Sequence, residues 1–297
     1  MEVQTASNGE CHEWLDLLSA HNAACIRRLI ATPAAPSFQH VPTRKQAAVA
    51  TLLYQDASSG ELRVIMTTRA LHLRSHPGQA SLPGGKVDSS DADVVVTALR
   101  ESVEEIALPS RSAMHLHTGY PFLSKLGLLV HPVVFLVRYP AEVLKRLRAS
   151  PDEVSDIWST PLRAFLSSTA PEGMELSDPR SVDKHRPPQE AFRTYTDVPW
   201  LGAVYRLHRF RSSHQLVKGL TADVLISVAH KTYGVEPRYA IRADGQMSWQ
   251  SMVEMVVKRY MGPQRAEQRW GDGESGDAQG SSEAFPTHIG HDDLADI

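Results

Sequence analysis

The sequence predicts an α/β fold in which layers of helices flank a sheet. Residues 126–137 form an almost wholly apolar, β-rich run that is typical of a central strand buried on both faces. Two shorter apolar runs, 47–54 and 62–67, lie on either side of the turn at 56–60 and predict two further strands. Apolar residues within 91–108 have helical spacing, so a helix separates these strands from the long apolar run. This arrangement fits an α/β/α sandwich.

A helical extension is predicted before the first strand. Residues 12–31 have helical periodicity, which ends before Pro33. The proline-rich segment 33–42 is expected to link this helix to the strands. We therefore expect residues 1–39 to be an N-terminal helix with its linker, and residues 1–10 to be disordered.

The second half of the chain predicts a short helix, a strand, a long polar loop, a strand and two helices, over 142–148, 152–158, 167–199, 200–210, 221–233 and 252–260. Gly234 is a favourable stop for the first of the two long helices. Residues 263–297 are dominated by Gly, Ser, Asp, Glu and Gln, and we expect them to be a disordered tail. Residues 40–262 then form one folded domain.

Composition excludes several classes of protein. Hydrophobic residues make up 42% of the 297 residues, enough for a sizeable core, and the formal net charge of −3 argues against a general nucleic-acid binder. No apolar run reaches the roughly 18 residues of a membrane helix. Cys11 and Cys25 match no disulfide framework or zinc spacing, so two free thiols in a reducing compartment are expected. Neither end carries a clear targeting signal, which leaves the cytoplasm and an organelle lumen, such as the peroxisome or the mitochondrion, open.

Three glutamates share one face of the helix predicted at 91–108. Glu101, Glu104 and Glu105 are spaced i, i+3 and i+4, where like charges repel by a few tenths of a kcal/mol per pair. A divalent cation would remove this repulsion, and hard cations such as Mg²⁺ prefer carboxylate oxygens. Gly84-Gly85 precedes the helix, and a glycine backbone can approach a ligand closely. A solvated acidic face is the alternative interpretation.

Basic residues crowd the loop before Pro83, namely Arg69, His72, Arg74 and His76. Such a loop is often only solvated surface. Beside an acidic metal site it could instead hold phosphate groups of a substrate while the metal neutralises others.

Two signatures then carry a resemblance to a known family. The chain resembles the Nudix box at Gly85, Asp91, Arg100, Glu101, Glu104 and Glu105. Three departures are present: Asp91 replaces the usual Glu, one extra residue lies between it and Arg100, and Ala107 replaces the usual Gly. The first two are similar to the coenzyme A diphosphatase subgroup. Residues 66–85 resemble that subgroup's second signature, with Leu82 in place of Phe.

The resemblance implies the Nudix fold, with a mixed sheet and the box as loop–helix–loop, over 40–262. It implies Mg²⁺ or Mn²⁺ held by Glu101, Glu105 and Glu104, with a contribution from the Gly85 carbonyl. It further implies catalytic roles for Glu101, Glu104 and Arg100, and substrate binding by Arg69, Arg74, Gly84 and Gly85. The implied reaction is hydrolysis of coenzyme A or its thioesters to 4′-phosphopantetheine (or its acyl form) and adenosine 3′,5′-bisphosphate.

Several alternatives stay open. A Nudix enzyme acting on oxidised nucleoside triphosphates or ADP-ribose would carry the same box, and a non-catalytic binding protein could share the scaffold. Glu153 is a candidate outer metal ligand or base, although a structural role is the simpler reading. His131 interrupts the long apolar run and is expected to be a satisfied structural group. A homodimer is compatible with the sequence.

Overall fold

The computed structural model describes residues 4–5, 10–177 and 191–261. Within them, nine strands form a mixed sheet in the order β1-β6-β8-β2-β3-β4, with β5 on β2, β7 on β8 and β9 on β3. These strands are β1 (Gln4–Thr5), β2 (Gln46–Gln55), β3 (Leu62–Arg69), β4 (Ala80–Ser81), β5 (Gly84–Lys86), β6 (Ala113–Thr118), β7 (Phe122–Leu123), β8 (Leu129–Val137) and β9 (Val154–Pro161).

The centre of the sheet is a parallel pair, β2 and β8, in which Ala48 lies opposite His131 and Leu53 opposite Leu136. Every residue of β8 is buried, as predicted for the long apolar run. The strands predicted around the turn at 56–60 are confirmed as the antiparallel pair β2 and β3.

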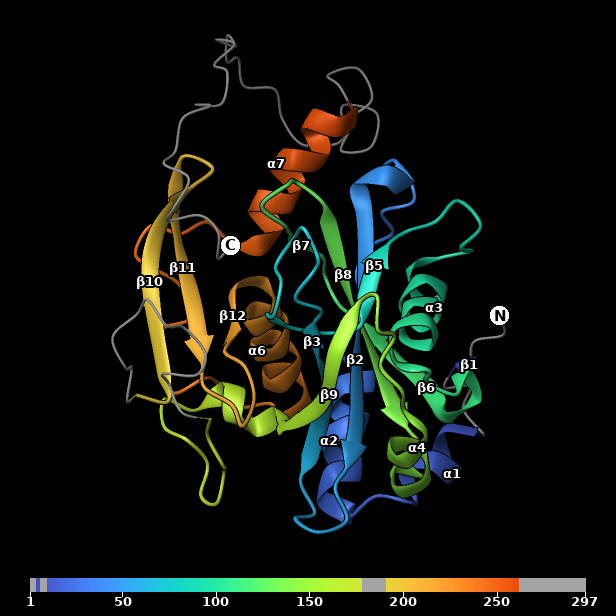
Figure 1. Ribbon diagram of the computed structural model, residues 1–297. Coiled ribbons are helices and arrows are strands. Elements are labelled where there is room, and N and C mark those ends of the chain that lie inside the picture. The colour runs from blue at the N-terminus through green and yellow to red at the C-terminus, as the bar shows by residue number, and fades with distance from the viewer. Residues whose placement is uncertain (1–3, 6–9, 178–190, 262–297) are drawn as a thin grey trace, which may run out of the picture.

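Helices cover both faces of this sheet (Figure 1). One face packs on α3 (Val94–Ile106), with Leu52 of β2 in the shared core, and the other on α2 (Ala20–Ile30) and α6 (Gly219–Tyr233), with Leu53 in that core. Neighbouring residues of β2 therefore enter opposite cores, as the period of a strand requires. The predicted α/β/α sandwich is confirmed.

The shorter helices and single turns are α1 (Glu10–Leu15), η1 (Thr43–Lys45), η2 (Ser110–Ser112), α4 (Pro140–Arg146) and η3 (Leu162–Leu166). The N-terminal extension contains two helices, so the single helix predicted over 12–31 is wrong. Ser19 lies between them and caps α2 by accepting a hydrogen bond from the Asn22 amide, 3.3 Å away. Gln4 and Thr5 pair with β6 and α1 begins at Glu10, so the disorder expected for residues 1–10 is wrong at these three positions.

Helices α2 and α6, which are far apart in the sequence, meet at the end of α6. Arg28 of α2 donates through Nη1 to the carbonyl oxygens of Thr232 and Tyr233, each 3.2 Å away. Gly234 ends α6 in the left-handed conformation, as the sequence predicted. A Cβ at Gly234 would lie 2.8 Å from Arg28 Cδ, so glycine also makes room for the arginine.

A second, three-stranded antiparallel sheet consists of β10 (Arg193–Trp200), β11 (Ala203–Phe210) and β12 (Val217–Lys218). The strand predicted over 200–210 is confirmed as β11. The loop predicted over 167–199 is wrong from Arg193, where β10 begins, and part of that loop lies outside the described residues. A hairpin turns at Leu201 and Gly202, which have φ values of +51° and +75°. Residues 193–199 are largely exposed and polar, so β10 has no apolar pattern, and its pairing with β11 makes it a strand.

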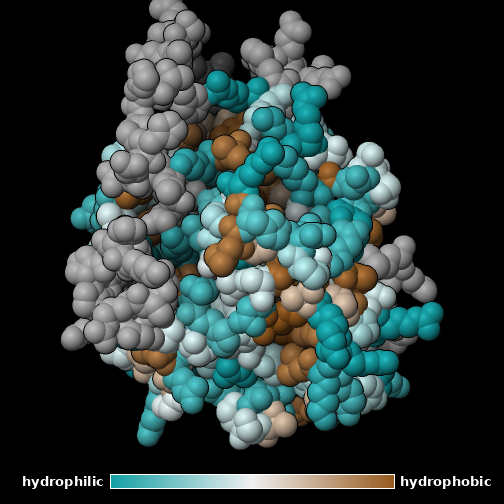
Figure 2. All heavy atoms as spheres, in the orientation of Figure 1, coloured by the Kyte–Doolittle hydropathy of each residue, from teal (hydrophilic) through white to brown (hydrophobic). Residues whose placement is uncertain are grey.

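The last helix of the described chain is α7 (Trp249–Met261), which packs its buried residues against β7 and β11. No helix in the described ranges is long and apolar enough to cross a membrane. Figure 2 shows polar residues over most of the face in view, with apolar residues gathered in its lower half. The predicted tail at 263–297 lies outside the described residues, and the limits 1–39 and 40–262 stay predictions.

Candidate active site

Helix α3 begins about two turns before the acidic residues Glu101, Glu104 and Glu105. Its N-cap is Asp93, whose Oδ1 accepts hydrogen bonds from the amides of Val95 and Val96 at 2.8 and 2.9 Å. Ser89, Ser90 and Asp91 are also residue types suited to capping, but they belong to the preceding turn, where Asp88 accepts hydrogen bonds from Ser90. The apolar face of α3 packs on the sheet and so fixes which residues face the glycine loop.

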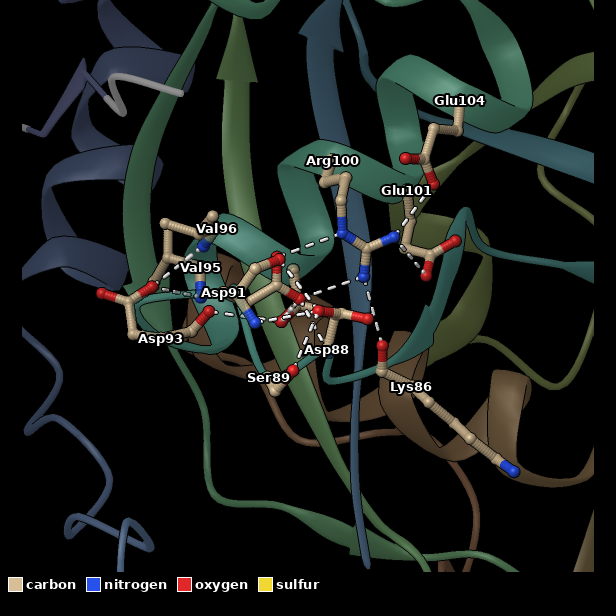
Figure 3. Close-up of polar contacts among 12 residues, drawn as sticks. Lys86, Asp88, Ser89, Asp91, Asp93, Val95, Val96, Arg100, Glu101 and Glu104 are labelled. Carbon is tan, nitrogen blue, oxygen red and sulfur yellow. Dashed lines mark hydrogen bonds and ion pairs between the residues drawn. The ribbon is translucent and has the colours of Figure 1, made fainter. Parts of the chain in front are cut away.

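Arg100 is the centre of a charged cluster (Figure 3). Its Nε and Nη2 donate to the two oxygens of Asp91 at 3.1 and 3.0 Å, which is a bidentate contact. Nη1 donates to Glu101 Oε1 and Glu104 Oε2, both at 2.9 Å, and Nη2 reaches the Lys86 carbonyl at 3.2 Å. The hydrogen bonds to Asp91 raise the pKa of Arg100 above its usual value. The guanidinium thus links the segment between Lys86 and Asp91 to the acidic face of α3.

The three glutamates have different environments. Glu105 is buried, with 6% of its surface exposed, and accepts a hydrogen bond from the Gly84 amide. Burial, together with the charges of Glu101 and Glu153, raises the pKa of Glu105 to about 8. Burial also raises the pKa of Glu101. Glu104 points outward, with 53% of its side chain exposed. Glu101 and Glu105 therefore form the inner part of the acidic face.

The glycine loop lies directly against these carboxylates. Gly84 and Gly85 form β5 and pair with Val49 and Ala48 of β2. A Cβ at Gly85 would lie 2.2 Å from Glu101 Oε1, and one at Gly84 would lie 2.4 Å from the Ala48 carbonyl oxygen. Both positions therefore require glycine, because any side chain would displace the glutamate or the strand.

The basic loop, residues 69–79, packs beside the same carboxylates. The Ala70 amide donates to the Glu153 carbonyl at 2.9 Å, and the Ser150 amide donates to the Glu105 carbonyl at 2.8 Å. The turn that carries Glu153 thus joins the basic loop to α3. The charge of Arg69 acts against the rise in the Glu105 pKa, and the charge of Glu153 contributes to it. Arg69 and Glu153 are therefore close enough to the acidic face to influence it.

The other basic residues of this loop differ in their contacts. His72 Nε2 lies 3.1 Å from the Asp152 carbonyl oxygen, and His76 Nδ1 lies 3.1 Å from Gln79 Oε1, so both hold the loop in place. Arg74 is exposed and makes no hydrogen bond or ion pair with another described residue. The structure brings Arg69 to the acidic face and leaves Arg74 at the surface.

Two lysines near this loop, Lys125 and Lys218, were not predicted from the sequence. Burial lowers the pKa of His76, and the positive charges of Arg69, Lys218 and Lys125 lower it further. Lys125 precedes β8 and Lys218 belongs to β12, so no local pattern could have joined them to the loop.

His131 is buried, with Nε2 3.0 Å from Gln46 Oε1, which confirms its predicted structural role.

The site suits a hydrated hard cation. In the described ranges, no three His, Cys, Asp or Glu side chains converge into a preformed metal cage. The inner carboxylates are Glu101 and Glu105, which repel each other and are desolvated. The backbone of Gly85 lies within contact distance of Glu101. Carboxylate oxygens are the donors that Mg²⁺ or Mn²⁺ prefers, and Glu101 shares its charge with Arg100 while Glu105 has no such partner among the described residues. Mg²⁺ usually keeps several of its waters.

Comparisons with known proteins agree with this geometry. The NUDIX domain family model matches residues 44–180. Nudix hydrolase 15, mitochondrial, from Arabidopsis thaliana is 33% identical over 199 residues, which are 66% of this chain and 61% of that protein. The chain thus spans less than two thirds of the Arabidopsis protein. NudL from Salmonella newport, described as an uncharacterized Nudix hydrolase, is 33% identical over 174 residues, which are 59% of this chain and 77% of NudL.

Among solved structures, the Nudix hydrolase RenU from M. smegmatis matches 41% of this chain and 73% of its own, with 20% identity and a TM-score of 0.33. The family assignment rests on the NudL alignment, which covers more than two thirds of NudL, and on the match to the NUDIX domain, which includes β2, the glycine loop and all of α3. The chain belongs to the Nudix hydrolase family.

Proposed function

We propose that this protein is a metal-dependent diphosphatase of coenzyme A or acyl-coenzyme A. The products are 4′-phosphopantetheine, or its acyl form, and adenosine 3′,5′-bisphosphate. One observation carries the proposal. The basic loop, whose sequence resembles the signature of the coenzyme A subgroup, is hydrogen-bonded to the Glu153 turn beside the acidic face of α3. Cationic and carboxylate groups are thus adjacent, as a polyphosphate substrate with a metal requires.

We assign the metal to Glu101 and Glu105, with Glu104 as a further ligand and the Gly85 carbonyl as a backbone donor. A bound Mg²⁺ or Mn²⁺ supplies charge neutralisation of the diphosphate and lowers the pKa of a coordinated water. Both inner carboxylates face the glycine loop, because Glu105 accepts a hydrogen bond from the Gly84 amide and Glu101 Oε1 is the atom that a Cβ at Gly85 would meet.

Protein groups would perform the remaining steps. Arg100 positions the helix, because its donors hold Asp91, Glu101 and Glu104 at hydrogen-bond distance. Glu101 and Glu104 are the candidate general bases that remove a proton from the attacking water. Arg69 lies beside the acidic face and can hold a phosphate oxygen through its planar fork of donors. Arg74 is assigned to the more distant 3′-phosphate of coenzyme A.

The proposal also covers the domain limits, the partner and the location of the protein. Residues 40–262 constitute the Nudix hydrolase domain, and the partner is the small-molecule substrate rather than nucleic acid or a membrane. We place the enzyme in the cytoplasm or in the lumen of an organelle, and a homodimer remains a prediction.

Ala107 keeps the left-handed conformation in which helices usually end, so this departure from the box leaves the end of α3 in the ordinary geometry.

Product chromatography tests the proposal. The purified protein is incubated with coenzyme A, ADP-ribose or an oxidised nucleoside triphosphate, each with Mg²⁺ and with Mn²⁺. The expected result is adenosine 3′,5′-bisphosphate from coenzyme A at a kcat/KM well above that for the other two. Glu105→Gln serves as the inactive control. Preferential cleavage of ADP-ribose or of the triphosphate would reassign the substrate, and no metal-dependent cleavage of any of them would contradict a diphosphatase.

A further inference from the structure

A separate cavity of about 540 Å³ lies at the other end of the central strands from the glycine loop. Its lining includes Tyr54 at the end of β2, Leu136 and Val137 at the end of β8, and Trp14 and Leu17 from the N-terminal extension. Gly85 pairs with β2 at Ala48, six residues before Tyr54, so the two sites are about 20 Å apart along the strand. The carboxyl ends of parallel strands are where α/β sheets commonly bind ligands, and the cavity volume is in the range of small-molecule sites.

Arg138 is the cationic residue of this cavity. Its guanidinium carbon lies 5.3 Å from the centroid of the Trp14 ring and 4.6 Å from that of Tyr139, so aromatic rings hold it in place. Nε is buried and has no hydrogen-bond partner. Among the described residues, no carboxylate forms an ion pair with this arginine. A positioned guanidinium without an anionic partner is suited to an anion from outside the chain.

The rim of the cavity is apolar and partly strained. Tyr139 has φ +51° and ψ +57°, a left-handed conformation that L residues rarely adopt. The residue is 51% exposed, and its ring lies beside Arg138. Leu17 is 49% exposed at the same cavity. The apolar walls thus extend to the opening, and a ligand with an apolar body would cover both side chains.

The charged residues that line the cavity limit the charge of the ligand that it can bind. Two carboxylates, Asp56 and Glu142, also line the cavity. Asp56 is engaged by its own turn, because Oδ2 accepts from the Ser59 amide and hydroxyl at 2.9 and 2.8 Å. The two carboxylates disfavour a polyphosphate, and because Asp56 is occupied by its own turn, Glu142 is the carboxylate that opposes a single negative charge bound at Arg138.

We propose that this cavity binds a small monocarboxylate with an apolar body, with the carboxylate on Arg138 and the body against Trp14, Tyr54 and Leu17. This site is independent of the diphosphatase proposal, since it shares no residue with the acidic face or the basic loop.

Isothermal titration calorimetry with a matched pair of probes tests the site. Octanoate, kept below its micellar concentration, is compared with 1-octanol, which has the same chain without the charge. Saturable octanoate binding is expected, with a dissociation constant about tenfold or more below that of 1-octanol, the ratio expected for a charge-assisted contact. Arg138→Met should remove this difference. Arg146→Met, an exposed arginine of α4 that does not line the cavity, should keep it.

Further measurements separate binding from folding. Hydrolytic activity and melting temperature of Arg138→Met should remain close to wild type, and Arg138→Lys, which keeps the charge but not the planar fork, provides a second variant. Equal affinity for octanoate and 1-octanol, or a preference that survives in Arg138→Met, would overturn the proposal. So would a wild-type dimer that binds no octanoate and is dissociated by Leu17→Ser, because the cavity would then be an interface between two copies.

Discussion

The α-carbon of Gly85 faces Glu101 so closely that a methyl group on it would lie 2.2 Å from Glu101 Oε1. Gly85→Ala must therefore displace the carboxylate or open the loop, and we expect kcat to fall about a hundredfold, equivalent to about 2.7 kcal/mol. Steady-state kinetics with coenzyme A measures the loss. Lys86→Ala, in which an exposed neighbouring side chain is removed and its carbonyl is kept, is the control. Wild-type turnover in folded Gly85→Ala would show that Glu101 is not required in this position.

Glu105→Gln should reduce kcat at least about a hundredfold while the fold persists, because a neutral amide lacks the charge that we assign to metal binding. Calorimetric titration with Mg²⁺ and Mn²⁺ should show weaker binding of both ions. Removal of the ions with a chelator should abolish wild-type activity, and their return should restore it. A Gln variant with normal metal affinity and turnover would remove Glu105 from the site.

The pKa of Glu105 also predicts how the stability of the metal-free protein depends on pH. Folding raises this pKa from 4.5 to about 8, so the folded state holds a proton that the unfolded state releases between these values. This stabilisation is complete below pH 4.5 and is lost as the pH rises toward 8, by up to about 1.4 kcal/mol per pH unit.

Thermal unfolding with a chelator, at several pH values from 5 to 9, tests this dependence. The melting temperature of Glu105→Gln should rise relative to that of wild type as the pH increases, since the amide has no proton to lose. A constant difference between the two proteins across this range would contradict the raised pKa.

Ala107 ends α3 in a left-handed conformation, with φ +53° and ψ +37°. An L residue in this conformation costs about 1 kcal/mol, which glycine avoids. Ala107→Gly should therefore raise the free energy of unfolding by up to about 1 kcal/mol without changing kcat. Chemical denaturation measures the first quantity. A loss of stability would mean that the methyl group makes packing contacts worth more than the strain.

The two arginines of the basic loop should differ in substrate selectivity. Arg74→Ala is expected to reduce kcat/KM for coenzyme A about tenfold to a hundredfold and to leave dephosphocoenzyme A nearly unchanged, as loss of a charge-assisted contact with the 3′-phosphate requires. Arg69 lies beside Glu105, so Arg69→Ala should reduce kcat/KM for both substrates. Equal losses in Arg74→Ala would remove its 3′-phosphate role, and a lower melting temperature would indicate a bracing role instead.

Local sequence patterns predicted β8 and the acidic face of α3. The continuous apolar run at 126–137 indicated a buried strand, and glutamates at i, i+3 and i+4 indicated the acidic face before its surroundings were known. The choice between Asp91 and Asp93 as the cap of α3 could not be made in this way, since both are suitable residues. It depends on the Arg100 guanidinium, which holds Asp91 from nine residues away.

Other features required tertiary structure. β10 is polar and exposed along most of its length, and its pairing with β11 overrides the weak strand signal of its sequence. Lys125, from the turn before β8, and Lys218, from β12, reach the surroundings of His76 from positions far apart in the chain. The environment of Arg138 likewise combines Trp14 with the end of β8, which no sequence window contains.

The contact of Arg28 with the last carbonyls of α6 also bears on the time at which the protein can fold. These partners are separated by 204 and 205 positions, and the core between α2, α6 and the sheet includes residues from both helices. During synthesis, the N-terminal helices therefore emerge long before the surface that covers them. At ribosomal rates of about 5–20 residues per second, the apolar side of α2 would wait on the order of ten seconds or more for α6. Chaperones that shield nascent chains would find the apolar side of α2 exposed during this interval.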